Sequence, residues 1–172
     1  MAELGTGYGA ILTDPPWDFR TWSDKGKGRS PAYATMSFEE LADLPVAASA
    51  AEDCALFMWA VDSHLQTAMD LIQAWGFVYK TIGLIWVKPS IGLGYWTRKQ
   101  AEVCLMATRG KPKRKSRAIS QVIKAPRREH SRKPDETYWC IEELVAGPYL
   151  EMFARQKRGG WDSWGNEVEK FE

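Results

Sequence analysis

The 172-residue sequence lacks the features that would place it in several large classes of protein. No apolar run approaches the roughly 20 residues of a membrane span. The N-terminal segment contains acidic Glu3 and no basic region, unlike a secretory signal peptide. The three cysteines are far apart and odd in number, which favours reduced core thiols in a cytoplasmic protein. The two histidines, His64 and His130, are spaced too widely for a convincing zinc site, so no metal is expected.

Two further absences concern the architecture. The first apolar run is not followed by the G-x-G-x-x-G turn of ordinary dinucleotide-binding domains. There is also no internal repeat and no evident boundary between domains. Because 45% of the residues are apolar and 26% are charged, the composition is that of an ordinary globular protein. We therefore expect a single domain over residues 1–172 with a sizeable core.

Basic residues and tryptophan, by contrast, are conspicuous. The chain has nine tryptophans, and between Arg109 and Lys133 it has eleven Lys or Arg residues and one acid, Glu129. A smaller basic group lies within residues 20–29. Such segments often form solvated loops, but Lys and Arg also neutralise backbone phosphates whatever the base sequence. Both segments flank stretches suspected of holding a base, which favours nucleic acid as a partner.

The segment Asp14-Pro15-Pro16-Trp17 directly follows a predicted buried strand over residues 9–13. The prolines end that strand, because neither has an N–H to give to a β-ladder. The segment therefore lies at the carboxyl edge of a sheet, where α/β proteins bind ligands. A carboxylate, a backbone carbonyl and a large ring suit a planar base with an exocyclic amine. A strand-ending turn with a core tryptophan is an equally open interpretation of these four residues.

The rest of the chain alternates between strand and helix patterns. A long Gly- and Lys-rich loop is predicted over residues 19–34, and an irregular, Trp-rich tail from Gly159 onwards. Ser37 and Glu40 match a capping box at the start of a helix. This alternation predicts a three-layer α/β domain on a mostly parallel sheet. Helices are expected over residues 37–44, 63–75 and 134–145, and further strands over 54–59, 79–87, 102–108, 118–124 and 149–154.

A series of short motifs resembles the N6-adenine methyltransferases named for the seventy-kilodalton subunit of the mRNA N6-adenosine methyltransferase. The motifs follow the order of that family and cover most of residues 9–167. Asp14–Trp17 is the first of them, and the ordered set is far more specific than those four residues alone. The others are Ala32–Ser37, Ile85–Lys88, Gly94–Trp96, Glu102–Leu105, Thr108–Gly110, Ser131–Glu136 with Tyr138, Leu150–Arg155, Gly160–Trp161 and Trp164–Glu167.

The resemblance implies a Rossmann-like methyltransferase fold with a circularly permuted motif order. The strand at residues 151–155 is then expected beside the strand that ends at Asp14, with one antiparallel strand near the sheet edge. It also implies methyl transfer from S-adenosylmethionine to the N6 amino group of adenine. A compact single domain resembles bacterial or phage DNA methyltransferases, so DNA is favoured. An RNA methyltransferase and a non-catalytic nucleic-acid-binding partner subunit are the alternatives, as a monomer or a homodimer.

The resemblance also implies roles for individual residues. Asp14 and the Pro15 carbonyl would accept the two amino N–H bonds of the target adenine, with Pro16 completing the catalytic turn. Trp17 and Tyr33 would stack on or border the base. Lys88 and Arg109 belong to motifs that are expected to bind the substrate.

For the cofactor, Lys133 is expected to bind the methionine carboxylate, with Glu102 orienting the lysine. Glu151 and Phe153 would lie at the methionine end, although Phe153 also suits a packing role. Arg155 and Asn166 are candidates for the ribose or the carboxylate. Glu167 stands where the family often has glutamine, and its carboxylate is expected to accept hydrogen bonds from the ribose.

Overall fold

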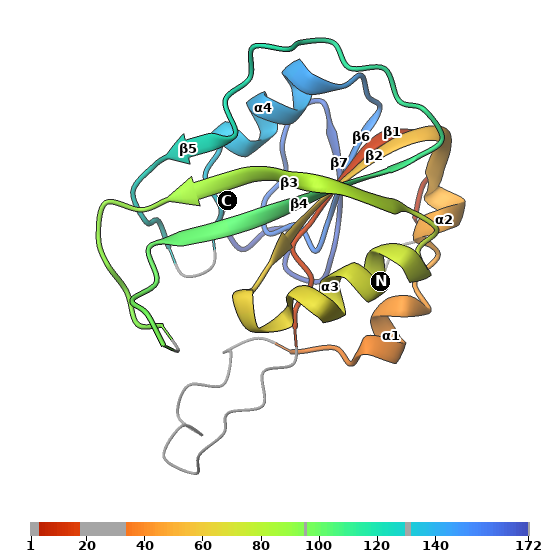
Figure 1. Cartoon of the computed structure of the whole chain (residues 1–172). Coiled ribbons are helices and arrows are strands. Elements are labelled where there is room, and N and C mark those ends of the chain that lie inside the picture. Colours follow the sequence, from red (N-terminus) through yellow and green to blue (C-terminus); the bar gives the residue numbers. More distant parts are fainter. Residues whose placement is uncertain (1–3, 18–33, 95, 130–131, 172) are drawn as a thin grey trace.

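A seven-stranded sheet forms the centre of the protein, with strand order β5-β3-β4-β2-β1-β6-β7 (Figure 1). The computed structural model describes residues 4–17, 34–94, 96–129 and 132–171. The strands are β1 (Tyr8–Thr13), β2 (Ala50–Ala60), β3 (Val78–Val87), β4 (Ala101–Arg109), β5 (Val122–Lys124), β6 (Tyr149–Met152) and β7 (Trp161–Trp164). The helices are α1 (Phe38–Ala42), α2 (Val46–Ser49), α3 (Leu65–Ala74) and α4 (Glu136–Leu144), with a 3-10 turn, η2, at Asp62–His64.

The three-layer α/β architecture confirms the predicted fold class. Figure 1 shows α1, α2 and α3 on one face of the sheet and α4 on the other. Successive residues of β1 supply the two cores, since side chains alternate along a strand. Ile11 packs in the cluster that contains Leu71 of α3, and Leu12 in the cluster that contains Ile141 of α4. None of the described helices has the length and apolar character that crossing a bilayer requires.

The strand directions also agree with the predicted permuted order. β1 pairs in parallel with β2 on one side and with β6 on the other. Only β4 runs the other way among the described strands, and it lies inside the sheet between β2 and β3 rather than near the sheet edge as expected. Its amino end, rather than its carboxyl end, therefore reaches the edge at which β1 and β6 end. Asp14 follows β1 at this edge, and Thr13 aligns with Met152 of β6.

Local signals in the sequence have the expected structural effects in some places and not in others. The Ser37 hydroxyl accepts the Glu40 N–H at 3.2 Å, and the Glu40 carboxylate accepts the Ser37 N–H at 2.7 Å, which confirms the capping box. The irregular tail was a wrong prediction, because residues 161–164 form β7 beside β6. The strand predicted over 149–154 ends at Met152, since Phe153 has a positive φ of 58°.

Candidate active site

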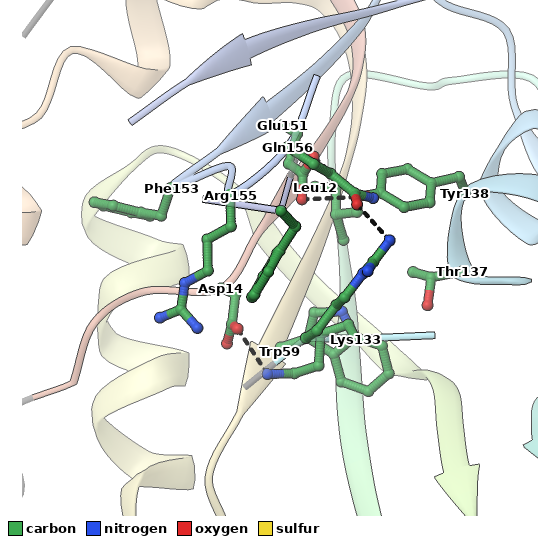
Figure 2. Close-up of a pocket in the computed structure, with 12 residues that line it drawn as sticks. Leu12, Asp14, Trp59, Lys133, Thr137, Tyr138, Glu151, Phe153, Arg155 and Gln156 are labelled. Atoms are coloured by element: carbon green, nitrogen blue, oxygen red, sulfur yellow. Dashed lines mark hydrogen bonds and ion pairs between the residues drawn. The ribbon is translucent and has the colours of Figure 1, made fainter. Parts of the chain in front are cut away.

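Asp14 and Lys133 form an ion pair at the carboxyl edge of the sheet, although they are 119 residues apart in sequence. The Lys133 ammonium lies 2.6 Å from Asp14 Oδ2 and 3.6 Å from Glu102 Oε2. The Lys88 ammonium donates to the other oxygen of Glu102. The four side chains thus form a row of alternating charge, which we call the ion row: Lys88, Glu102, Lys133, Asp14. Figure 2 shows the Asp14–Lys133 contact at the floor of a cavity.

The ion row keeps its central residues charged. Burial by itself raises the pKa of Glu102, but the charges of Lys133 and Lys88 outweigh it and hold the pKa below the ordinary value. For Lys133, burial lowers the pKa, and the carboxylates of Asp14 and Glu102 outweigh burial so that the pKa is raised. Both residues are therefore ionised at neutral pH, each because of its neighbours.

A second chain of hydrogen bonds crosses the same cavity, and we call it the tyrosine network: Glu151, Tyr138, Gln156 and Arg132. The Tyr138 hydroxyl donates to the Glu151 carboxylate at 2.9 Å (Figure 2). Arg132 donates to Gln156 Oε1 at 2.8 Å. Burial raises the pKa of Glu151 to about 7, the charge of Asp14 adds to the increase, and the Tyr138 hydrogen bond only partly opposes it. Glu151 is thus poised between its neutral and ionised forms near neutral pH.

Two cavities meet at Asp14, Phe153 and Arg155. The smaller one has a volume of about 480 Å³. The larger one has a volume of about 1130 Å³, and both volumes include space that is open to solvent. The smaller cavity is lined by Leu12, Asp14, Trp59, Arg132, Lys133, Thr137, Tyr138, Glu151, Phe153, Arg155, Gln156 and Phe171. The larger one is lined by Asp14, Pro16, Ala34, Met36, Glu40, Phe153, Ala154, Arg155, Asn166 and Glu167.

Polar atoms without partners point to a ligand in the smaller cavity. Thr137 Oγ1 and Trp59 Nε1 are buried and make no hydrogen bond within the described part of the chain. Buried polar groups are normally paired, so these atoms require an acceptor or donor from elsewhere. Lys133 lies 5.7 Å from the Trp59 ring centroid, which places a cation beside an unused N–H donor. A carboxylate suits this position, and the acid Glu151 suits an ammonium group in the same cavity. These residues fit the amino-acid end of S-adenosylmethionine.

Most of the residues predicted for the site are brought together by the fold. Glu102 contacts Lys133 as expected, and Glu151, Phe153 and Arg155 line the smaller cavity. Asn166, Glu167 and Pro16 line the larger one, where Glu167 pairs with Arg155 Nε at 3.1 Å. The Pro15 carbonyl accepts the Trp17 N–H at 2.8 Å, which leaves its second lone pair for another donor.

Three predicted residues have other positions. Arg109 ends β4 opposite Cys54, at the far end of the sheet from Asp14, and its guanidinium donates to the Ala47 carbonyl. Lys88 is 8% exposed and bonded to Glu102, so it supports the ion row rather than facing a substrate.

Trp17 is 3% exposed and packs in the core, which agrees with the interpretation of this segment as a strand-ending turn and removes its ring from stacking on a base. Tyr33 lies outside the described residues.

The sequence did not indicate several residues of the smaller cavity. Trp59 ends an apolar strand and looked like a core residue, and Thr137 and Gln156 stand within or beside quoted motifs without a charge to mark them. Phe153 is the only described non-glycine residue with positive φ, a strained backbone of the kind found at functional sites. No cluster of three or more His, Cys, Asp or Glu suited to a metal ion occurs within the described ranges.

Comparison with known proteins assigns this chain to a family. The family model of MT-A70 matches residues 8–167. The chain belongs to the MT-A70 family. This result confirms the resemblance on which the motif assignment rests.

Relatives within and around the MT-A70 family differ in size. The chain is 33% identical to the Type II methyltransferase M.MunI of Mycoplasma sp, over 94% of this chain and 78% of that protein. It is 32% identical to an MT-A70-like N(6)-adenosine-methyltransferase of Arabidopsis thaliana, over 98% of this chain and 24% of that protein. For the human N(6)-adenosine-methyltransferase catalytic subunit METTL3 the identity is 26%, over 94% and 28%. Family and relatives together support N6-adenine methylation.

Proposed function

We propose that this protein transfers a methyl group from S-adenosylmethionine to the N6 amino group of adenine in DNA, in the cytoplasm. The observation that carries the proposal is the position of Asp14. It lies where the two cavities meet, it pairs with Lys133, and it opens the motif that the MT-A70 family shares. The Asp14 carboxylate therefore borders both the space for the methyl donor and the path by which the target adenine would approach.

S-adenosylmethionine, when bound, supplies an electrophilic methyl group. Lys133 would hold its carboxylate, with Trp59 Nε1 as a second donor, while Asp14 and Glu151 are the acids available for its ammonium group. Asn166 and Arg155, which line the larger cavity, would bind the nucleoside end. Phe153 and Arg155 line both cavities, so they would contact the molecule where it passes from one cavity to the other.

The acceptor nitrogen is a poor nucleophile, because its lone pair is delocalised into the purine ring. Asp14 and the Pro15 carbonyl would each accept one of its N–H bonds and turn the lone pair toward the methyl group. Fixing such a near-attack geometry is worth several kcal/mol of the barrier. The nitrogen gains a methyl group and loses one proton, which Asp14 or water accepts. Asp14 does not need to be a strong base, since the nitrogen becomes acidic once it carries the methyl group.

Similarity to a type II methyltransferase favours DNA over RNA. The chain is 33% identical to M.MunI, against 32% and 26% for the two N(6)-adenosine-methyltransferases. A substrate base inside a duplex must be extruded, at a cost of a few kcal/mol, before it reaches Asp14.

The experiment that tests the proposal is tritiated methyl transfer to matched single-stranded DNA, duplex DNA and RNA, each with an adenine-free control. We expect label in DNA that depends on adenine. Label only in RNA would select the alternative substrate, and label in the adenine-free strand would refute adenine as the acceptor. Calorimetry with S-adenosylmethionine separates an enzyme from a non-catalytic partner subunit, since the partner would not bind it. Sedimentation decides between a monomer and a homodimer.

A further inference from the structure

The connection between β3 and β4, residues 88–100, takes no part in the chemistry derived above but leaves the same edge of the sheet. Figure 1 shows it as a hairpin that projects beyond the ends of the two strands. Three apolar side chains near its tip are exposed: Trp96 at 92%, Leu93 at 67% and Ile91 at 64%. A cluster of exposed large apolar side chains with polar surroundings marks an interaction site.

The hairpin is braced rather than loose. The Lys88 N–H donates to the Gln100 carbonyl at 2.9 Å, and the Gly92 N–H donates to the Lys99 carbonyl at 2.7 Å. A side chain at Gly94 would collide with the Thr97 carbonyl, so glycine allows the turn to close. These bonds hold the base of the hairpin in place, which reduces the entropy that ordering this segment would otherwise cost on binding.

The surroundings of Trp96 are cationic. Residues 89–100 contain Arg98 and Lys99 and no acid, although Lys99 pairs with Asp62 at 3.4 Å. β5 runs parallel to β3, so the segment after β5 leaves at the same edge and adds Arg127, next to Arg128, which pairs with Asp135 at 2.5 Å. The Arg127 guanidinium packs directly against Gly92, which places the two segments side by side. Aromatic rings interleaved with cations are suited to a nucleic-acid strand, whose bases stack and whose phosphates are neutralised.

The hairpin also lies close to the reacting groups. Its first residue, Lys88, bonds to Glu102, and Glu102 contacts Lys133 of the Asp14 ion pair. Trp96 stands six positions before Glu102, so the two are at most on the order of 20 Å apart along the chain. Trp96 therefore lies within the reach of a few nucleotides from the site.

We propose that the Trp96 indole stacks on a nucleobase near the target adenine, on the strand that carries it, while Arg98 and Arg127 contact the neighbouring phosphates. This inference rests on the proposed function and extends it to how the polymer is held. Such stacking depends little on base identity, because every base has a π-face. It also offsets part of the stacking that is lost when the target adenine leaves its neighbours.

The test measures the affinity of the full chain for a fluorescein-labelled 24-nucleotide pyrimidine DNA strand with one adenine, by fluorescence anisotropy. Trp96→Ala is expected to weaken binding roughly 5- to 150-fold, Trp96→Phe to restore most of the affinity, and Trp96→Leu to restore little. The matched control is Trp139→Ala, since Trp139 of α4 is also exposed, at 54%, and should leave affinity unchanged.

Abasic sites placed one at a time on each side of the adenine locate the partner. At one position the loss caused by Trp96→Ala should disappear, because the base it stacks on is already absent. The salt dependence of binding should be unchanged in Trp96→Ala and shallower in Arg98→Gln and Arg127→Gln, since only the arginines release counterions.

Several results would overturn the inference. One is equal affinity of the Trp96→Ala variant and the wild type; another is an equal loss at every abasic position. If Trp96→Ala instead converts a dimer into a monomer in sedimentation, the hairpin is a protein interface. A different result would refute the proposed function but not the inference: the wild type binds the strand in a Trp96-dependent way but methylates no adenine-containing polymer.

Discussion

The ion row and the tyrosine network border one cavity, yet they treat their carboxylates in opposite ways. In the ion row, Lys133 and Lys88 outweigh burial and keep Glu102 ionised. In the tyrosine network, a neutral hydroxyl is the partner of Glu151, so burial prevails and the pKa rises to about 7. The difference shows that the partner, more than the depth of burial, decides the charge of a carboxylate here. One side of the cavity is fixed in charge, and the other responds to what binds.

The largest effect is expected at the exposed end of the ion row. Asp14→Ala and Asp14→Asn should each reduce methyl transfer by a factor of about 1000 or more, because the acceptor nitrogen is no longer oriented. The fold should persist, since the Asp14 side chain is 30% exposed and Lys133 retains Glu102. Methyl-transfer rates and circular dichroism measure the two quantities. Near-normal activity of Asp14→Ala would remove Asp14 from the mechanism.

The second-largest effect is expected from replacing Lys133, the central cation of the ion row. Lys133→Met leaves Asp14 and Glu102 facing each other without a positive charge between them. We expect affinity for S-adenosylmethionine to fall about 100-fold and the free energy of unfolding to fall by about 1–3 kcal/mol. Lys133→Arg keeps the charge and should recover most of the stability. Calorimetry and thermal unfolding report both, and unchanged cofactor affinity in Lys133→Met would contradict the assignment.

Lys88 lies at the far end of the ion row from Asp14 and acts on the cavity through Glu102. Lys88→Met should weaken cofactor binding about 10-fold or less and leave the rate at saturating cofactor nearly unchanged, since Lys88 positions Glu102 and does not reach the cavity. Restoration of affinity by Lys88→Arg would support a role for the charge. A fall in the saturated rate as large as that of Asp14→Ala would instead place Lys88 among the reacting groups.

The last prediction is a gain in stability, and it comes from the tyrosine network. The folded-state pKa of Glu151, about 7, lies above its ordinary value of 4.5, so the folded state holds the proton more tightly. Stability is therefore lost as pH rises from 4.5 through 7. Glu151→Gln removes this loss and should raise the free energy of unfolding at pH 8 by up to about 3 kcal/mol, with no gain at pH 4.5. Thermal unfolding at the two pH values decides, and equal changes at both would be inconsistent with the raised pKa.

The edge of the sheet that carries the site was predictable because local signals mark it. An apolar strand that stops at two prolines, a capping box and a motif order that requires a permuted sheet are all present in the sequence. The direction of β4, by contrast, has no such local signal in the sequence. Arg109 was expected at the site since its motif lies between two others, but β4 runs antiparallel and carries its last residue to the opposite end.

Other failures came from residues whose environment is set by distant parts of the chain. Trp17 was expected to face a base, and the fold buries it against the layer of α1 and α3. The tail from Gly159 onwards was predicted to be irregular, yet pairing with β6 stabilises β7 and buries Trp161 and Trp164. Tyr138 gave no hint that it would bond to Glu151, as helix α4 and strand β6 are brought together only by the tertiary fold.

The reversed direction of β4 has a consequence for how such a protein can change. β4 begins at the edge of the sheet that carries Asp14, so the hairpin that precedes β4 lies at this edge and leads directly into Glu102. The hairpin projects away from the sheet (Figure 1). If Trp96 holds the polymer as proposed, a hairpin of different sequence between Lys88 and Gln100 would change how the polymer is held without altering the strands that carry Asp14 and Glu151.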